Sequence, residues 1–289
     1  MSKIGIVLVA GHMGKATVDA LIRKGVKNED IVVISRDQET LFYFEDLGVN
    51  TRQVGLSSMP LSVLEDVDKL MLISNPIMDP TLMIVQHTGV IYAAKQAGVK
   101  HIVYTSLANL NQKSVVGPVH RATEYALIST GIPYTILRNS TYLEKVFNTV
   151  DVKRALETGK LLSRSEGNKL NAAARKDMAE AAAVILTSEG HGNKTYNLTA
   201  PITFTMKFLA ERIAAISGKS IEYVEATEEE AADWIYGSSY DCDVEEDSTS
   251  TQAIFRNGFG DFFTDDLANL IGHKNLTTPD DVIREALEG

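Results

Sequence analysis

The sequence predicts an α/β fold in which a doubly wound parallel sheet is followed by a smaller, helix-rich C-terminal lobe. Short β-branched runs alternate with stretches of helical spacing over about the first 140 residues, a pattern typical of βαβ units. The runs are apolar almost throughout, as in parallel strands that are covered on both faces. After about Leu143 helical segments predominate. We therefore expect one domain over residues 1–143 and a mostly helical lobe over 144–289, between which the chain is free to cross.

The expected strands of the first domain are short. They are Ile4–Val9, Ile31–Ser35, Leu70–Ser74, His101–Thr105 and Tyr134–Leu137. Between them, apolar residues recur at helical spacing, as in Ala16, Val18, Leu21 and Ile22. Gly25 and Gly98 each precede a strand, where left-handed helix ends are expected. Right-handed crossovers between such strands give a doubly wound sheet.

The second lobe is expected to contain helices at 149–157, 175–187, 205–217 and 228–236, and strands at 195–198 and 221–224. The last helix has a clear start, with Thr278 as N-cap, Pro279 at the first position and two aspartates in the first turn. The acidic, serine-rich stretch Asp241–Ser250 predicts a solvated loop.

Composition excludes several classes of protein. The 289 residues are 44% hydrophobic and 23% charged, which suits a globular chain, and the formal net charge of −10 argues against a nucleic-acid binder. No apolar run approaches the length of a membrane span. Cys242 is the only cysteine and the six histidines lack metal-ligand spacing, so we expect neither a disulfide framework nor a metal site. These bounds predict a soluble, cytoplasmic protein.

The first strand-to-helix turn predicts phosphate binding. Gly11, His12, Met13 and Gly14 lie where a dinucleotide fold brings backbone N–H groups to a pyrophosphate, and the two glycines match the last two of a G-x-x-G-x-x-G pattern. Leu8 replaces the first glycine. We expect Leu8 to keep a conventional backbone conformation and to point into the core, which weakens nucleotide binding without preventing it; a turn with no ligand role is the alternative.

The end of the second strand predicts the kind of nucleotide. Arg36 stands immediately beyond that strand, where NAD-specific enzymes place an acid for the ribose hydroxyls. A guanidinium suits a 2′-phosphate in charge and geometry, so NADP(H) is the expected cofactor. Pairing of Arg36 with Asp37 or Glu39 on the surface is the alternative.

Several motifs follow one another in a fixed order along the chain. They are Ile73–Pro76, Asp79–His87, Ala97–Ser106, Ala122–Tyr125, Ile132–Asn139, Arg175–Asp177, Gly192–Leu198 and Leu270–Gly272. In sequence and spacing these motifs resemble the NmrA-like group of atypical short-chain dehydrogenases, and within it bacterial NADPH-quinone oxidoreductases and triphenylmethane reductases. The resemblance covers nearly the whole chain. It implies a Rossmann-like fold and an oxidoreductase that uses NADP(H) and a small aromatic or quinone acceptor; whether the chain is a monomer or a homodimer stays open.

The resemblance also implies roles for particular positions. The glycine turn would hold the pyrophosphate and Arg36 the 2′-phosphate. Three groups of residues would line the rest of the cofactor: Ser74, Asn75 and Pro76 on the adenosine side; Tyr104, Thr105 and Ser106 near the nicotinamide ribose; Arg138, Asn139 and Ser140 beside the nicotinamide. The position of these residues after predicted strands supports the same assignment, since ligands bind at the carboxyl ends of such strands.

The catalytic residues are less well defined. The Tyr-x-x-x-Lys pair of ordinary short-chain dehydrogenases does not occur in this sequence. A quinone or cationic dye needs only positioning beside the nicotinamide, with protons from water. His120 and Tyr142 are the candidate polar residues of the substrate cleft, the alternative being that each has a structural role. A cofactor sensor that binds NADP(H) without turnover is a second hypothesis for the whole chain, and loss of nucleotide binding through Leu8 is a third.

Overall fold

The computed structural model describes most of the chain. The described residues are 2–56, 59–74, 79–109, 116–147, 149–227, 229–230, 234, 256–258 and 260–288. They form two compact units: residues 1–110, 116–139 and 175–198 belong to the first, and residues 111–115, 140–174 and 199–289 to the second. The predicted division at Leu143 stays a prediction, while the chain itself crosses between the units, returning to the first over residues 175–198.

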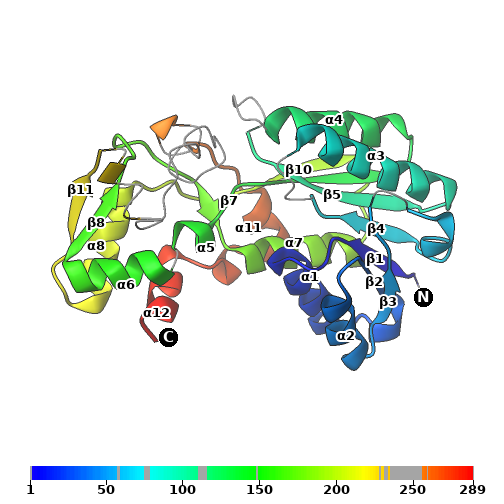
Figure 1. Ribbon diagram of the computed structural model, residues 1–289, viewed down its shortest axis with the longest axis horizontal. Coiled ribbons are helices and arrows are strands. Elements are labelled where there is room, and N and C mark those ends of the chain that lie inside the picture. Colours follow the sequence, from blue (N-terminus) through cyan, green and yellow to red (C-terminus); the bar gives the residue numbers. More distant parts are fainter. Residues whose placement is uncertain are drawn as a thin grey trace. The chain divides into compact units, whose positions relative to one another are not determined.

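A seven-stranded sheet forms the centre of the first unit (Figure 1). Its order is β10-β6-β5-β4-β1-β2-β3, and every neighbouring pair is parallel. The strands are β1 (Ile4–Val7), β2 (Ile31–Ser35), β3 (Asn50–Gln53), β4 (Lys69–Leu72), β5 (His101–Leu107), β6 (Tyr134–Asn139) and β10 (Lys194–Leu198). This arrangement confirms the predicted doubly wound, Rossmann-like fold.

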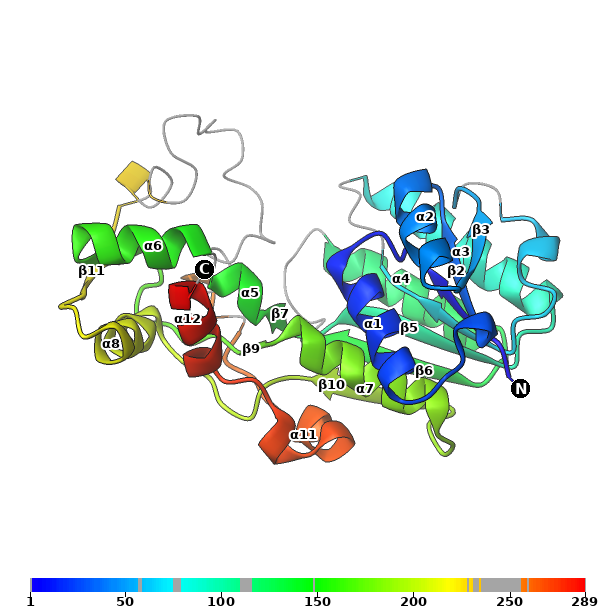
Figure 2. The same ribbon diagram turned by 90° about the horizontal axis from the view of Figure 1, so that it is seen from below.

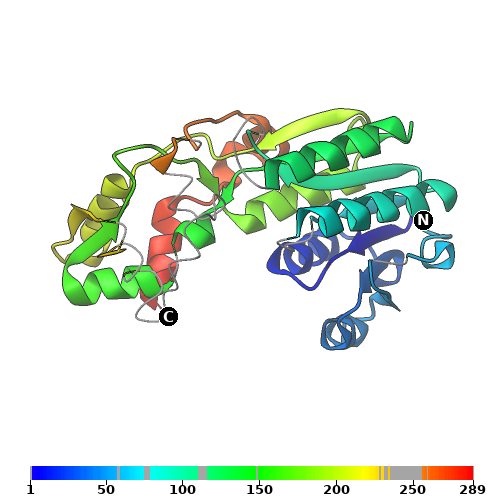
Figure 3. The same cartoon turned by 45° about the horizontal axis from the view of Figure 1, so that its top comes forward.

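Helices cover both faces of this sheet. Helices α3 (Pro80–Gln96) and α4 (Val116–Ser129) pack together on one face, and α1 (His12–Arg23) packs against α7 (Arg175–Thr187) on the other, on which α2 (Gln38–Asp46) also lies (Figures 2 and 3). Burial on two faces explains the continuous apolar runs of the inner strands, since β1 and β2 are buried at every position. Lys24, just after α1, forms an ion pair with Glu180 of α7 at 2.6 Å.

The second unit has its own apolar core. Helices α6 (Thr149–Thr158), α8 (Met206–Ser217) and α12 (Pro279–Glu288) pack around it, together with the short helix α5 (Leu143–Val146). The unit also contains the short helix α11 (Asp266–Ile271). Two small parallel pairs complete the unit: β8 (Lys160–Ser163) with β11 (Glu222–Glu225), and β7 (Thr141–Tyr142) with β9 (Ala172–Ala173). Thr278 caps α12 as predicted, because it exchanges hydrogen bonds with Asp281.

The element predictions were most accurate where strands are buried. Strand β2 and helix α7 have the predicted bounds, and Gly25 and Gly98 adopt the predicted left-handed conformation, with φ of 83° and 80°. The strand predicted at 195–198 in the second lobe corresponds to β10, which pairs with β6 at the edge of the main sheet and belongs to the first unit. The loop predicted at 241–250, Cys242 and most of the helix predicted at 228–236 lie outside the described residues.

Candidate active site

The topology of the sheet has a switch point at its carboxyl edge. Neighbouring strands β1 and β4 are followed by helices on opposite faces, α1 after β1 and α3 after β4. Helices that leave in opposite directions open a gap between the strand ends, which is where ligands bind in doubly wound sheets. The residues predicted to hold the cofactor lie just after β1, β2 and β4 or in the carboxyl-terminal parts of β5 and β6 and just beyond them. The described ones of the first unit therefore gather at one edge of the sheet.

The turn after β1 leads directly into a helix with free N–H groups. Gly11 is the N-cap of α1, makes no side-chain cap and has no acidic residue after it in the first turn. The first intrahelical hydrogen bonds are donated by Gly14 and Lys15 to the Gly11 carbonyl, so the N–H groups of His12 and Met13 precede them. The His12 side chain is exposed and that of Met13 is buried. This helix start is a favourable place for a phosphate.

The two glycines of the turn are needed for different reasons. A Cβ on Gly14 would lie 2.4 Å from the Cα of Val9, so only glycine lets α1 approach the chain there. A Cβ on Gly11 would meet no atom within 4 Å. The fold itself therefore tolerates a side chain at Gly11, and the space in front of this residue is open to a ligand.

Leu8 differs from expectation. Its φ is +67°, the left-handed conformation that favours glycine, so the predicted conventional backbone is wrong. Its side chain is nevertheless half-buried against the core of the first unit, as predicted. The turn thus keeps the backbone shape that a glycine would give it, at an energetic cost of ~1–2 kcal/mol for a side chain in this region.

Two cations flank the end of β2. Arg36 is exposed, and no described residue accepts a hydrogen bond or ion pair from its side chain. Lys15 of α1 lies over the ring of Tyr43, 5.2 Å from its centroid. The positive charges of Lys15 and Arg36 both contribute to lowering the pKa of Asp37. Sequence reasoning missed Lys15, because it stands 21 positions before Arg36.

The carboxylate next to Arg36 is already engaged. Asp37 caps α2, accepting hydrogen bonds from the backbone N–H and the hydroxyl of Thr40, and these bonds lower the pKa of Asp37. It forms no ion pair with Arg36 among the described contacts, so the alternative of an Arg36–Asp37 surface pair is not seen. A carboxylate used in this way is poorly placed to receive ribose hydroxyls, whereas the guanidinium is free.

Strands β4 and β5 are joined at their carboxyl ends. The Ser74 N–H donates to Thr105 Oγ1 at 2.8 Å, and the Thr105 side chain is buried. This bond fixes the chain where β4 ends. Asn75 and Pro76, which were also predicted to line the adenosine side, lie outside the described residues.

Tyr104 and His120 form a buried pair. The Tyr104 hydroxyl lies 2.8 Å from His120 Nδ1, and the two side chains are 0% and 6% exposed. Burial lowers the pKa of His120 to about 4 and raises that of Tyr104. The Tyr104 side chain has no surface to offer a cofactor. The imidazole of His120 is neutral at neutral pH, and its hydrogen bond to Tyr104 uses Nδ1, which leaves Nε2 available as far as the described residues show.

The strongest polar cluster at this edge joins β5, β6 and α4. Glu124 of α4 is buried and accepts from Ser106 Oγ at 2.6 Å, Arg138 Nε at 3.0 Å and Arg138 Nη2 at 2.7 Å. Ser106 and Arg138 are register partners on neighbouring strands. Sequence reasoning predicted both of these residues but not Glu124, since nothing local indicates that its carboxylate faces the two strands.

The remaining predicted residues fall into both units. Asn139 ends β6 and is buried, and its Oδ1 has no hydrogen-bond partner in the described part of the chain. Such an orphaned acceptor is consistent with a site that a ligand completes. Ser140 and Tyr142 belong to the second unit, where Tyr142 pairs with Ala173 in the β7–β9 ladder and is half-buried.

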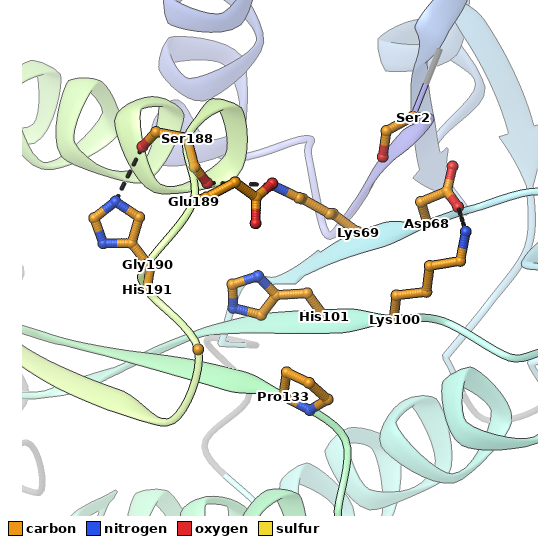
Figure 4. A pocket seen from close by; sticks show the side chains of 11 residues that line it. Ser2, Asp68, Lys69, Lys100, His101, Pro133, Ser188, Glu189, Gly190 and His191 are labelled. Carbon is orange, nitrogen blue, oxygen red and sulfur yellow. Dashed lines mark hydrogen bonds and ion pairs between the residues drawn. The ribbon is translucent and has the colours of Figure 1, made fainter.

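A cavity of about 550 Å³ lies at the opposite, amino-terminal edge of the sheet (Figure 4). Lys69, His101 and Pro133, at or just before the starts of β4, β5 and β6, line it together with the 188–192 turn after α7. Lys69 Nζ donates to the carbonyls of Leu186 and Ser188, which caps α7. Lys69, Ser188 and His191 thus have hydrogen-bond partners within this part of the protein. None of the residues that line the cavity is among the predicted site residues.

Among the described residues, no group of three His, Cys, Asp or Glu side chains is arranged to hold a metal ion. Within the same residues, every helix is too short or too polar to cross a bilayer.

Comparisons with known proteins found a family model, curated relatives and solved structures that are similar to this chain. The model of the NmrA-like family matches residues 1–263. Quinone oxidoreductase 2 of Escherichia coli (strain K12) is 34% identical over 232 residues, 79% of each chain. The structure of Citrobacter sp. triphenylmethane reductase complexed with NADP(H) has a TM-score of 0.89 at 33% identity, covering 98% of this chain and 99% of that one. The E. coli NADPH-dependent quinone oxidoreductase complexed with NADPH has a TM-score of 0.87 at 30% identity, with the same coverage.

Proposed function

The chain belongs to the NmrA-like family, and from this premise we propose that it is an NADPH-dependent oxidoreductase that reduces a quinone or a similar conjugated acceptor. When bound, NADPH supplies the hydride. With one proton from water, that hydride converts a quinone into its hydroquinone. The observation that carries the proposal is that three features lie at the carboxyl edge of one parallel sheet. They are the glycine turn after β1, with open space at Gly11, the cation Arg36 after β2, and the buried cluster in which Glu124 holds Ser106 and Arg138.

The cofactor is NADP(H), as in the solved relatives, and the local chemistry supports this choice. The N–H groups of His12 and Met13 would receive the pyrophosphate in front of the open Gly11. Arg36, with Lys15 nearby, would receive the 2′-phosphate. The capping role of Asp37 leaves NADH without the acid that NAD-specific sites present to the ribose.

The nicotinamide end would lie among residues at the carboxyl ends of β5 and β6. Ser106, Arg138 and the unpaired Asn139 Oδ1 are the polar groups that the first unit offers there. The hydrogen bond from the Ser74 N–H to Thr105 Oγ1 holds the chain at the ends of β4 and β5. Thr105 would thereby border the ribose of the cofactor, and Ser74 its adenosine side. Tyr104 would act indirectly, by holding His120.

Catalysis would depend on positioning rather than on a strong acid. His120 is neutral and buried, and the chain lacks the tyrosine–lysine pair that protonates a ketone. A quinone accepts hydride readily and needs only alignment beside the nicotinamide and hydrogen bonds to its oxygen. His120 Nε2 is a candidate donor of such a bond, and Tyr142 is a candidate stacking surface for the acceptor.

A steady-state assay with a panel of acceptors tests the proposal. Purified protein is mixed with NADPH or NADH and with quinones or triphenylmethane dyes, and cofactor binding is measured in parallel by calorimetry. We expect turnover with NADPH and at least one quinone. Tight binding of NADPH without turnover of any acceptor would contradict the proposal and support a cofactor sensor instead.

A further inference from the structure

The bidentate pair between Glu124 and Arg138 leaves half of a guanidinium uncommitted. Arg138 uses Nε and Nη2 to hold the carboxylate, and its side chain remains 32% exposed. Within the described part of the chain, no other group accepts a hydrogen bond from this guanidinium. The two N–H groups of Nη1 therefore form a donor edge that points away from Glu124.

The positive charge behind this donor edge is largely neutralised by the Glu124 carboxylate. Glu124 is 5% exposed and carries one negative charge directly against the guanidinium, and the pair raises the pKa of Arg138. An oxygen that approaches Nη1 therefore meets strong hydrogen-bond donors but little net positive charge. Such an edge suits a neutral carbonyl oxygen, whereas an anion gains little attraction and loses its hydration.

Ser106 fixes the geometry from the neighbouring strand. Its hydroxyl donates to Glu124 Oε1, the same oxygen that receives Arg138 Nε, so the carboxylate is held by two strands at once. Because β5 and β6 are paired in register at Ser106 and Arg138, neither partner can shift without disturbing the sheet. The donor edge is thus preorganised before any ligand arrives.

We propose that Glu124 is a positioning residue that determines the charge preference of the acceptor site: it holds Arg138 so that the free edge binds a neutral quinone carbonyl, and its carboxylate disfavours anionic acceptors. The inference rests on the proposed quinone reductase function. It predicts that removing the carboxylate charge uncovers a positive charge at the site.

The test compares a naphthoquinone with its monosulfonate in wild type and in Glu124→Gln. Glutamine keeps the shape of the side chain and an oxygen that accepts from Ser106, but it leaves Arg138 uncompensated. We expect the ratio of kcat/KM for the sulfonate to that for the neutral quinone to rise at least about fivefold, which is the effect of one unit charge about 4 Å away even in bulk water. The dissociation constants of the two quinones for NADP⁺-saturated protein, measured by calorimetry, should shift in the same sense.

Two controls separate this effect from a general loss of structure. Asp280→Asn breaks another bidentate pair, between Asp280 and Arg212 in the second unit, and should leave the ratio unchanged. Glu124→Asp keeps the charge and should also retain the wild-type preference. If Glu124→Gln does not fold, Arg138→Gln tests the same idea in reverse, because an uncompensated carboxylate should lower the ratio.

An unchanged ratio in folded Glu124→Gln, or a ratio that Asp280→Asn shifts equally, would overturn the inference. Wild-type protein that reduces neither quinone would instead contradict the proposed function. The two failures are therefore distinguishable in one experiment.

Discussion

Leu8 carries the clearest conflict between a residue and its backbone. Its φ of +67° places a branched apolar side chain in a conformation that glycine adopts without strain, while the side chain contacts the core. Alanine at this position would lose the apolar contact and keep the strain, whereas glycine would lose the contact and relieve the strain. We therefore expect Leu8→Gly to be more stable than Leu8→Ala by ~1 kcal/mol, the reverse of the usual order.

Urea unfolding of the two variants measures this difference directly. The comparison cancels the lost packing, which both variants share. Equal stabilities, or a more stable alanine variant, would mean that the turn relaxes around Leu8 and stores no strain.

Arg36 and Lys15 provide a test of cofactor preference at the same scale. Both cations flank the end of β2, but only Arg36 presents a fork that fits a phosphate. Arg36→Ala should weaken NADPH binding by ~1.5–3 kcal/mol, the range of a charged hydrogen bond, with a smaller loss for Lys15→Ala. NADH binding should change little in either variant. Calorimetry with both nucleotides decides the point, and equal losses for NADPH and NADH would show that Arg36 supports the fold rather than the phosphate.

Residue patterns indicated the parts of the candidate site that lie near a strand end, and missed those that come from helix surfaces. Gly11, Gly14 and Arg36 come soon after the ends of β1 and β2, so their place near the carboxyl edge of the sheet follows from topology. Lys15 and Glu124 reach the site from helix surfaces, and only packing decides which way a helical side chain faces. The left-handed φ of Leu8 could not be predicted, because leucine gives no local signal for it.

At the start of helix α1, Gly14 is required by the packing of the fold, whereas Gly11 leaves space for a ligand. Gly14→Ala puts a methyl group against the backbone of Val9 and should destabilise the protein by about 2–3 kcal/mol, since α1 must move. Gly11→Ala fills open space at an allowed φ of −77° and should change stability by less than ~0.5 kcal/mol.

NADPH affinity distinguishes the two variants further. We expect Gly11→Ala to bind NADPH more weakly despite its stability, because the methyl group occupies the phosphate approach. Thermal unfolding and calorimetry of both variants test the assignment. Unchanged NADPH affinity in Gly11→Ala would remove this turn from the cofactor site.

The packing of α3 and α4 against the sheet predicts a pH dependence. Burial lowers the pKa values of His87 on α3 and His120 on α4 to about 4, below the ordinary 6.5 of the unfolded chain. Between pH 6.5 and 4 these histidines are therefore protonated in the unfolded state while they stay largely neutral in the folded state. The free energy of unfolding consequently falls as the pH falls. Each histidine contributes at most about 3 kcal/mol to this loss, and above pH 6.5 neither contributes.

His120→Asn tests this origin. Asparagine can retain a partner for the Tyr104 hydroxyl but does not titrate in this range. The difference in urea midpoint between pH 7.5 and pH 4.5 should therefore be smaller in the variant than in wild type. The same difference in both proteins would assign the pH dependence to other groups, such as His101 and His191, whose pKa values are also lowered.

For the whole molecule, the alternation of apolar runs and helical stretches was enough to predict the sheet, because buried parallel strands are apolar at nearly every position. The edges were harder. Strand β3 reads Asn-Thr-Arg-Gln and is only partly buried, so no apolar signal marks it. Strand β10 comes after the chain has crossed into the second unit and returned to the first. The spacing of elements in the sequence does not indicate this return, and the parallel pairing with β6 is what assigns β10 to the first unit.

The proposed transfer of hydride from NADPH to a quinone can be observed in an anaerobic single-turnover experiment. Protein saturated with NADPH is mixed rapidly with a naphthoquinone, and the absorbance of the reduced nicotinamide is followed while hydroquinone is quantified. We expect a first-order decay much faster than the reaction in buffer, with one hydroquinone formed for each NADPH oxidised, and a slower decay at subsaturating NADPH in Arg36→Ala. Bound NADPH that persists for as long as free NADPH under the same conditions would show that the chain does not pass hydride to the quinone.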